Sequence, residues 1–235
     1  MRLKIEFISE DSFDRRDFNN YFINSLIWNL LRDTEFAALH DSKTFKFFNF
    51  SEILPIKDFI AGEAYKFFMS SPNNLLIDEL GRKLEKLNSF RLGVHRFKIK
   101  EIKKFELPIG NKWVTSTPIV LYKDNRKNEY FSFERDLDFE FFLNRLKENS
   151  LKKWNQYFNK DAKVPFHLFE NLIFKRTVVK KFRKQKKEFI IIGTMCELIL
   201  PKIHSKKVVE FYKFIRDTGL GEKNSFGFGF INPIS

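Results

Sequence analysis

The segment NSFRLG at residues 88–93 recurs as NSFGFG at residues 224–229, with four of the six letters identical. Each copy follows the second predicted helix of its half of the chain. This shared position indicates that one structural unit occurs twice. A chain of 235 residues has room for two such domains, each of about 110 residues.

The first half of the chain alternates strand and helix patterns. Leu3, Ile5 and Phe7 alternate with polar residues and predict a strand, and residues 18–32 have helical spacing. Ser71 and Pro72 are typical of an N-cap and a first helical position. The predicted order is β-α-β-β-α-β, with strands at 2–9, 45–53, 63–70 and 90–102 and helices at 18–32 and 72–87.

The second half repeats this order. We expect Ser205 to cap its second helix and Gly219 to end it in a left-handed conformation. The predicted elements are a strand at 112–123, a helix at 137–158, a long hairpin of 167–182 and 187–200, a helix from 205 to 219 and a strand at 225–231. The sequence therefore predicts an α+β fold of two tandem ferredoxin-like (RRM-like) βαββαβ domains, at residues 1–108 and 109–235.

The charge of the chain indicates an acidic partner. Forty-three Lys and Arg against 30 Asp and Glu give a net charge of +13 and a pI near 9.7. A protein this basic usually meets a polyanion such as nucleic acid, although the charge could serve solubility alone.

The remaining totals exclude several classes of protein. A single cysteine, Cys196, rules out a disulfide framework and a cysteine-based zinc site, and its apolar surroundings predict a core position. The start of the chain lacks the apolar region of a signal peptide. No stretch reaches the ~20 apolar residues of a membrane span. We therefore expect a cytoplasmic protein.

A glycine-rich loop, GLGEKNSFGFG, occupies residues 219–229 and holds four of the nine glycines, Gly219, Gly221, Gly227 and Gly229. Its spacing matches neither a P-loop nor a dinucleotide fingerprint. Glycines here could let the backbone approach phosphate oxygens, with Lys223 adding charge. The alternative is a helix cap and turn that need glycine only for positive φ.

A basic segment, KRTVVKKFRKQKK, spans the predicted hairpin tip and has eight cationic residues among thirteen, including Lys180, Lys181, Arg183 and Lys184. Interleaved Val and Phe keep it strand-like, so it could grip a nucleic-acid backbone. It could equally be a solvated tip.

The ionisable residues offer no metal site. None of the four histidines has zinc-site spacing, and we expect His95 and His204 to be structural. The acidic series Asp11, Asp14 and Asp17 is better explained by charge at a helix N-terminus than by a metal ligand set.

His40 is the strongest candidate for chemistry. It follows the first helix, with Lys43 and Lys46 close behind it. A histidine titrates near neutral pH and can donate or accept a proton. A nearby lysine can neutralise charge on a reacting phosphate. A structural role for an isolated loop histidine is the alternative.

These features together resemble the CRISPR-associated repeat endoribonucleases, the Cas-six family. The resemblance spans the whole chain and is most specific at residues 219–229 and 39–50. It implies cleavage of CRISPR precursor RNA within each repeat, without metal or cofactor, by attack of a 2′-hydroxyl that leaves a cyclic phosphate and a 5′-hydroxyl. Repeat RNA and subunits of a CRISPR effector complex are the implied partners, and the chain could be a monomer or a homodimer.

The resemblance also implies roles for particular residues. His40 falls at the family histidine, expected to protonate the leaving oxygen, and Lys46 at its lysine, expected to stabilise phosphate charge. The glycine-rich loop would hold RNA backbone or pack against the active-site helix. In the family turn LIxN some members carry a tyrosine, whereas LIWN places Trp28 there, and an indole cannot act as a base. Tyr21 is the next candidate on that helix.

Trp28 leaves a second function open, a catalytically weak or silent RNA-binding protein on the same fold. A third reading is an unrelated basic scaffold, such as a ribosome-associated protein. Cleavage of repeat RNA in EDTA separates the first two.

Overall fold

The computed structural model describes residues 1–163, 167–184, 187–202 and 205–234. The chain divides into two compact units. The first is Met1–Leu107 together with Ser225–Gly227, and the second is Pro108–Asn224 together with Phe228–Ser235. Each contains an antiparallel sheet and helices, so the fold is mixed α+β.

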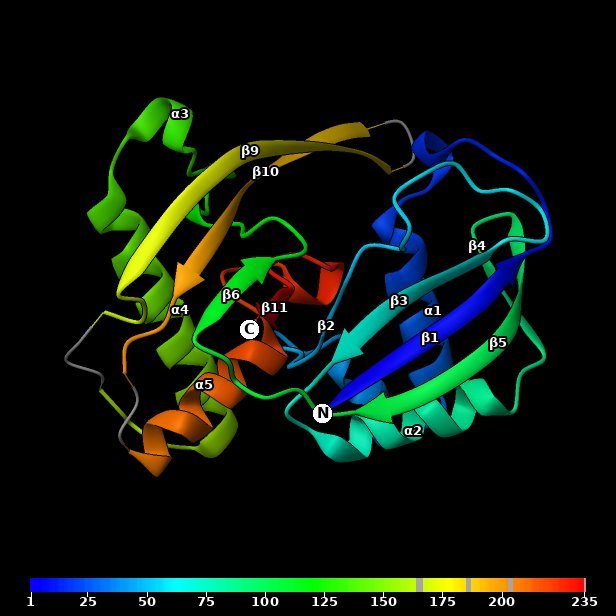
Figure 1. The fold of residues 1–235 in the computed structure, drawn as a ribbon, viewed down its shortest axis with the longest axis horizontal. Coiled ribbons are helices and arrows are strands. Elements are labelled where there is room, and N and C mark those ends of the chain that lie inside the picture. Colours follow the sequence, from blue (N-terminus) through cyan, green and yellow to red (C-terminus); the bar gives the residue numbers. More distant parts are fainter. Residues whose placement is uncertain (164–166, 185–186, 203–204, 235) are drawn as a thin grey trace. The chain divides into compact units, whose positions relative to one another are not determined.

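The first unit is built on a five-stranded sheet in the order β2-β3-β1-β5-β4 (Figure 1). Two helices, α1 and α2, lie on one face of this sheet. The elements are β1 (Arg2–Ser9), α1 (Asn20–Leu31), β2 (Asn49–Phe50), β3 (Ala64–Ser70), α2 (Asn74–Glu85), β4 (Ser89–Leu92) and β5 (His95–Phe105).

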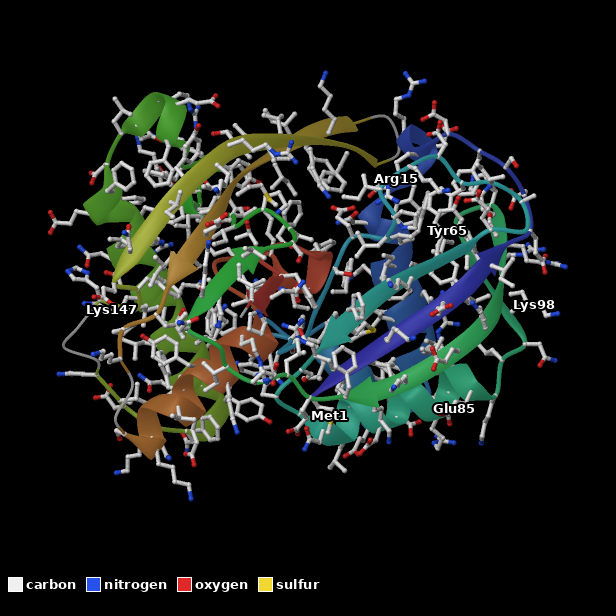
Figure 2. The ribbon with its side chains drawn as sticks, viewed as in Figure 1. Met1, Arg15, Tyr65, Glu85, Lys98 and Lys147 are labelled. Carbon is white, nitrogen blue, oxygen red and sulfur yellow. The ribbon has the colours of Figure 1, made fainter. Side chains whose placement is uncertain are left out.

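The alternation of β1 creates the core of this unit. Leu3, Ile5 and Phe7 are fully buried, because successive side chains of a strand point to opposite faces. They belong to one apolar cluster with Ile23 of α1 and Leu80 of α2. Polar side chains such as Glu85 and Lys98 project outward (Figure 2).

Three sequence predictions for this unit were wrong in detail. Residues 45–53 contribute only the two-residue strand β2, and residues 90–102 form a hairpin of β4 and β5 with Gly93 at its turn. Asn73, not Ser71, is the N-cap of α2 and accepts from the backbone N–H of Leu76. The Ser71 hydroxyl instead donates to the carbonyl of Phe47 at 2.7 Å, so it fastens the preceding loop.

The second unit has a four-stranded sheet in the order β11-β6-β10-β9 and a small β7–β8 hairpin. Helices α4 and α5 pack against each other, with the rings of Trp154 and Phe214 5.3 Å apart. The elements are β6 (Lys112–Thr115), β7 (Tyr122–Asp124), β8 (Glu129–Tyr130), α3 (Phe133–Asp136), α4 (Phe139–Phe158), β9 (Asn171–Lys184), β10 (Lys187–Ile199), α5 (Lys206–Thr218) and β11 (Ile231–Ile234).

The last strand lies later than the sequence predicted. Residues 224–226 form a 3-10 turn, and Gly227 and Gly229 have φ of +78° and +69°, which an extended strand cannot accommodate. Pairing therefore begins only at Ile231. The predicted strand 112–123 is likewise divided into β6 and β7, with Pro118, which has no N–H to donate, between them.

The predicted ends of α5 were confirmed. Ser205 is the N-cap residue, although its side chain makes no capping hydrogen bond. Gly219 follows the last turn with φ of +85°, but its ψ of 161° lies outside the left-handed helical region that the sequence predicted. In the part of the chain that the structure describes, no helix is both long and apolar enough to cross a membrane.

Candidate active site

One face of α1 lines a pocket of the first unit. Asn19 caps this helix by accepting from the backbone N–H of Tyr21 at 2.9 Å. Because Ile23 and Ile27 face the core, the opposite face is left open. The pocket has a volume of about 350 Å³ and is lined by Tyr21, Asn24, Ser25, Trp28, Asn29, Arg32, Ala37, His40 and Asp41. The expected face of residues 21, 25, 28 and 32 is therefore confirmed.

His40 reaches this pocket from the loop after α1. It follows a short 3-10 helix, Ala37–Leu39. Its ring stands edge-on to that of Trp28, with centroids 5.1 Å apart and an interplanar angle of 88°. The Nδ1 atom lies 2.6 Å from a carboxylate oxygen of Asp41. Because a carboxylate only accepts, Nδ1 carries the proton in this contact, which leaves Nε2 for a substrate.

Trp28 is wedged between the core and the histidine loop. The centroid of its indole lies 5.4 Å from that of the buried Phe48 ring. The same indole also contacts the His40 ring. The ammonium of Lys46 lies 5.9 Å from the indole centroid. Trp28 thus forms the part of the pocket wall that contacts the His40 ring.

Lys46 lies beside the pocket and does not line it. Its Nζ donates to the carbonyl oxygens of Leu39, His40 and Ser42, and it also contacts the Ser42 hydroxyl. Partial burial lowers the pKa of Lys46 from its ordinary value. In this structure Lys46 therefore closes the loop that carries His40.

The four glycines of the late loop, Gly219, Gly221, Gly227 and Gly229, are all buried, which favours the packing alternative over backbone exposed to RNA. A Cβ at Gly221 would lie 2.5 Å from the carbonyl oxygen of Val120. At Gly227 it would overlap the ring of Phe50, and at Gly229 the carbonyl of Leu220. These contacts show that the loop needs glycine for packing inside the protein.

The alternative in which this loop packs against the active-site helix is supported within the first unit. The Asn24 amide on α1 donates to the carbonyl oxygen of Ser225 at 2.7 Å. Gly227, in the same segment, lies against Phe50 of β2. The segment Ser225–Gly227 thus holds the helix that lines the pocket.

Replacing Gly229 by alanine tests whether the glycine-rich loop needs glycine where it packs against Leu220. Gly229 has φ of +69°, and the new Cβ would overlap the Leu220 carbonyl. Gly62→Ala is the matched control, because Gly62 has φ of +84° and no atom lies within 4 Å of the place that its Cβ would take. We expect Gly229→Ala to lower the free energy of unfolding by about 2 kcal/mol more than Gly62→Ala in urea denaturation. Equal losses would mean that the loop relaxes around a side chain.

Sequence reasoning missed Lys153. This α4 residue is 1% exposed, and its Nζ donates to the carbonyl oxygens of Gly219 and Gly221 and to Oδ1 of Asn224. Burial lowers the pKa of Lys153 to about 7. The residue follows Phe142, Leu146 and Asn149 on the buried face of α4. The helical spacing that places Lys153 on the same face as Phe142 and Leu146 was the sequence signal that could have predicted its burial.

The basic hairpin is present, and Lys180 and Lys181 differ in their surroundings. Lys181 is exposed on β9, whereas the Lys180 ammonium lies 5.7 Å from the ring centroid of Phe228. Arg183 and Lys184 belong to the backbone of β9, but their side chains lie outside the described residues. Lys223 has a positive φ of 58° and places its ammonium 5.3 Å from the ring centroid of Tyr122.

His95 and Asp14 make structural contacts. The ring of His95 stacks on Phe13 and meets Asp11 through Nδ1 at 2.6 Å. Asp14 caps the 3-10 helix Arg15–Asp17, and hydrogen bonds from Arg16 lower the pKa of Asp14 to about 2. His167 is exposed, and His204 lies outside the described residues.

The single thiol of the chain is buried. Cys196 is 1% exposed, and burial raises the pKa of its thiol to about 12. Within the described ranges no three His, Cys, Asp or Glu side chains gather as a metal site would require.

Comparison with known proteins identifies relatives of the chain. Residues 97–233 match the family model described as CRISPR associated protein Cas6, C-terminal. The chain is 39% identical over 240 residues to CRISPR-associated endoribonuclease Cas6 2 of Methanocaldococcus jannaschii, and the alignment covers 100% of both chains.

Solved structures share the fold. One described as CRISPR associated protein Cas6 has a TM-score of 0.73 at 23% identity and covers 100% of this chain and 99% of its own. Another, described as an RAMP protein binding different RNA substrates, has a TM-score of 0.69 at 21% identity, with 100% of both chains covered.

Proposed function

Because the chain belongs to the Cas6 family of CRISPR-associated proteins, we propose that it is an endoribonuclease that cleaves CRISPR precursor RNA within the repeats. The observation that carries this proposal is the pocket on α1, where His40 stands against Trp28 with Asp41 at Nδ1. An imidazole oriented by a carboxylate is suited to proton transfer.

The proposed reaction is an internal phosphoryl transfer. The ribose 2′-oxygen forms a bond to the adjacent phosphorus, and the bond from phosphorus to the 5′-oxygen breaks. The 2′-hydroxyl gives up its proton, and His40 supplies a proton to the leaving 5′-oxygen. The products are a 2′,3′-cyclic phosphate and a free 5′-hydroxyl, and no metal ion or cofactor takes part in these steps.

Trp28 cannot be the base that takes the 2′-proton, because an indole has only a donor N–H. We assign that role to His40 acting through a water molecule, or to solvent hydroxide, with Tyr21 of the same pocket as the next candidate. The Trp28 ring contacts His40 and offers a surface on which a nucleobase of the RNA can stack.

The cations divide into those near the chemistry and those that hold RNA. Lys46 fixes the histidine loop and adds positive charge near the phosphate. Lys180, Lys181, Arg183, Lys184 and Lys223 are proposed to bind the RNA backbone through charge. CRISPR repeat RNA is the proposed partner, with effector-complex subunits as further partners in the cytoplasm.

We also infer that the two units are tandem ferredoxin-like repeats, with residues 1–108 and 109–235 as their approximate extents. The strand orders support this. In β5-β1-β3-β2 and in β11-β6-β10-β9, the strand that comes first in the chain lies between the sheet's last strand and its third strand in chain order. The added strand β4 at one edge distinguishes the first unit.

Trp28 also favours a second candidate function, a weakly active or silent protein that binds repeat RNA. A missing general base typically costs 10²–10⁴-fold in rate. Such a protein would bind the repeat as tightly as an active relative. It would leave the RNA uncut over hours.

Incubation with the host's own repeat RNA in EDTA decides between the two. We expect cleavage at one site, with cyclic-phosphate or phosphate 3′ ends. A single 2′-deoxy substitution at the cut should abolish cleavage because it removes the nucleophile, while a 2′-deoxy substitution one nucleotide away should not. Cleavage of the RNA deoxygenated at the cut would contradict the mechanism, and binding without any cleavage would favour the silent protein.

A further inference from the structure

The ammonium of Lys46 has no hydrogen left for a substrate in this structure. An ammonium has three N–H donors. Four oxygen atoms surround it, three loop carbonyls and the hydroxyl of Ser42. A phosphate in the pocket would have to displace one of these contacts and loosen the loop of His40. A different cation is therefore needed for direct contact.

The position of Arg32 makes it the candidate for this direct contact with the phosphate. It is the C-cap of α1, one turn beyond Trp28, and lines the same pocket as His40. Among the nine residues that line the pocket, all of them described, it is the only one with a permanent positive charge. A phosphate placed here would face the Asp41 carboxylate and the partly negative carbonyl end of α1, so a cation is required.

The guanidinium of Arg32 is available for such a contact. Among the described residues its one hydrogen bond runs to the side-chain oxygen of Asn29 at 3.1 Å. No carboxylate among the described residues forms an ion pair with it. A guanidinium has five N–H donors in a fork that matches two phosphate oxygens. The bond to Asn29 leaves the other donors for a ligand and fixes the side chain toward the helix.

We propose that Arg32 is a catalytic residue that binds the non-bridging oxygens of the scissile phosphate and stabilises the charge that develops there. Lys46 is then a positioning residue that acts through the His40 loop. This inference rests on the proposed endoribonuclease function. It assigns the contact with the phosphate to the helix rather than to the loop lysine.

The test is single-turnover cleavage of the repeat RNA at saturating protein by wild type, Arg32→Ala, Arg32→Lys and Arg91→Ala. Arg91 is the matched control, since it is an exposed arginine of β4 outside the pocket. Each protein also receives RNA with sulfur in place of either non-bridging oxygen at the cut. Thermal melting checks that each variant is folded.

We expect Arg32→Ala to cut about 10²-fold more slowly than wild type, the usual loss for one donor to a developing oxyanion. Arg32→Lys should recover part of the rate, because it keeps the charge and loses the fork. Wild type should discriminate against sulfur at one of the two positions, and Arg32→Ala should lose that discrimination.

Two results would overturn the role of Arg32 while leaving the endoribonuclease intact. One is a folded Arg32→Ala that cuts as fast as Arg91→Ala. The other is a slow Arg32→Ala that discriminates against sulfur as wild type does, which would make the arginine structural. Failure of wild type to cut the unmodified RNA would instead overturn the proposed function, and this inference with it.

Discussion

His40→Ala is expected to slow single-turnover cleavage of the repeat RNA by 10²-fold or more, with little change in affinity. A general acid typically contributes 10²–10⁴-fold. His40 is exposed at the pocket rim, with a side-chain exposure of 57%, so its removal leaves the core intact. His167→Ala, at another exposed histidine, is the matched control.

The role of His40 as an acid can be separated from a role in binding. Replacing the 5′-bridging oxygen at the cut by sulfur gives a leaving group that needs no proton. If His40 acts only as the acid, and solvent hydroxide takes the 2′-proton, His40→Ala and wild type should cut this RNA at similar rates. A variant that stays 10²-fold slower on the sulfur substrate would show that His40 also acts before the leaving group departs, as the base through a water molecule. Normal cutting of the oxygen substrate would place the acid elsewhere.

The part of this site that could be predicted from sequence lies on one helix and the loop after it. Helical spacing alone placed Tyr21, Ser25, Trp28 and Arg32 on one face, because side chains three and four residues apart are neighbours. The pocket confirms that face. The engagement of Lys46 by loop carbonyls could not be predicted, since backbone carbonyls have no sequence signature.

For a similar reason the sequence left two roles open for the glycine-rich loop. Glycine at 227 and 229 has the same sequence signal whether a ligand or the protein itself fills the space of the missing side chain. The contacts of Gly227 with Phe50 and of Gly229 with Leu220 favour packing inside the protein. Phe50 is distant in sequence and Leu220 lies on the other side of the loop, so neither contact has a local sequence signal. The last strand was placed too early because the alternating Phe and Gly of residues 226–230 imitate a strand pattern.

Lys153→Met is expected to destabilise the protein by about 3–5 kcal/mol near pH 9, because a thioether cannot donate to the acceptors of the glycine-rich loop that the Lys153 amine satisfies. The side chains have similar length, so little cavity is left. The acceptors are two carbonyls of the glycine-rich loop and the Asn224 side chain. An exposed lysine of the same helix, Lys152, gives the control: Lys152→Met should change the free energy of unfolding by less than about 1 kcal/mol.

The pH dependence of this difference reports the titration of the buried Lys153 amine. Burial lowers the pKa of Lys153 to about 7 in the folded protein, from 10.5. Between these values the unfolded chain binds more protons than the folded one, so the stability of wild type rises with pH. Below pH 7 both states are protonated, and the full penalty of burying the charge remains. The gap in unfolding free energy between wild type and Lys153→Met should therefore widen by about 1.4 kcal/mol per pH unit above pH 7. Urea denaturation of both proteins at pH 7.5 and 9.5 measures it, and two parallel pH profiles would mean that the folded protein keeps Lys153 charged throughout.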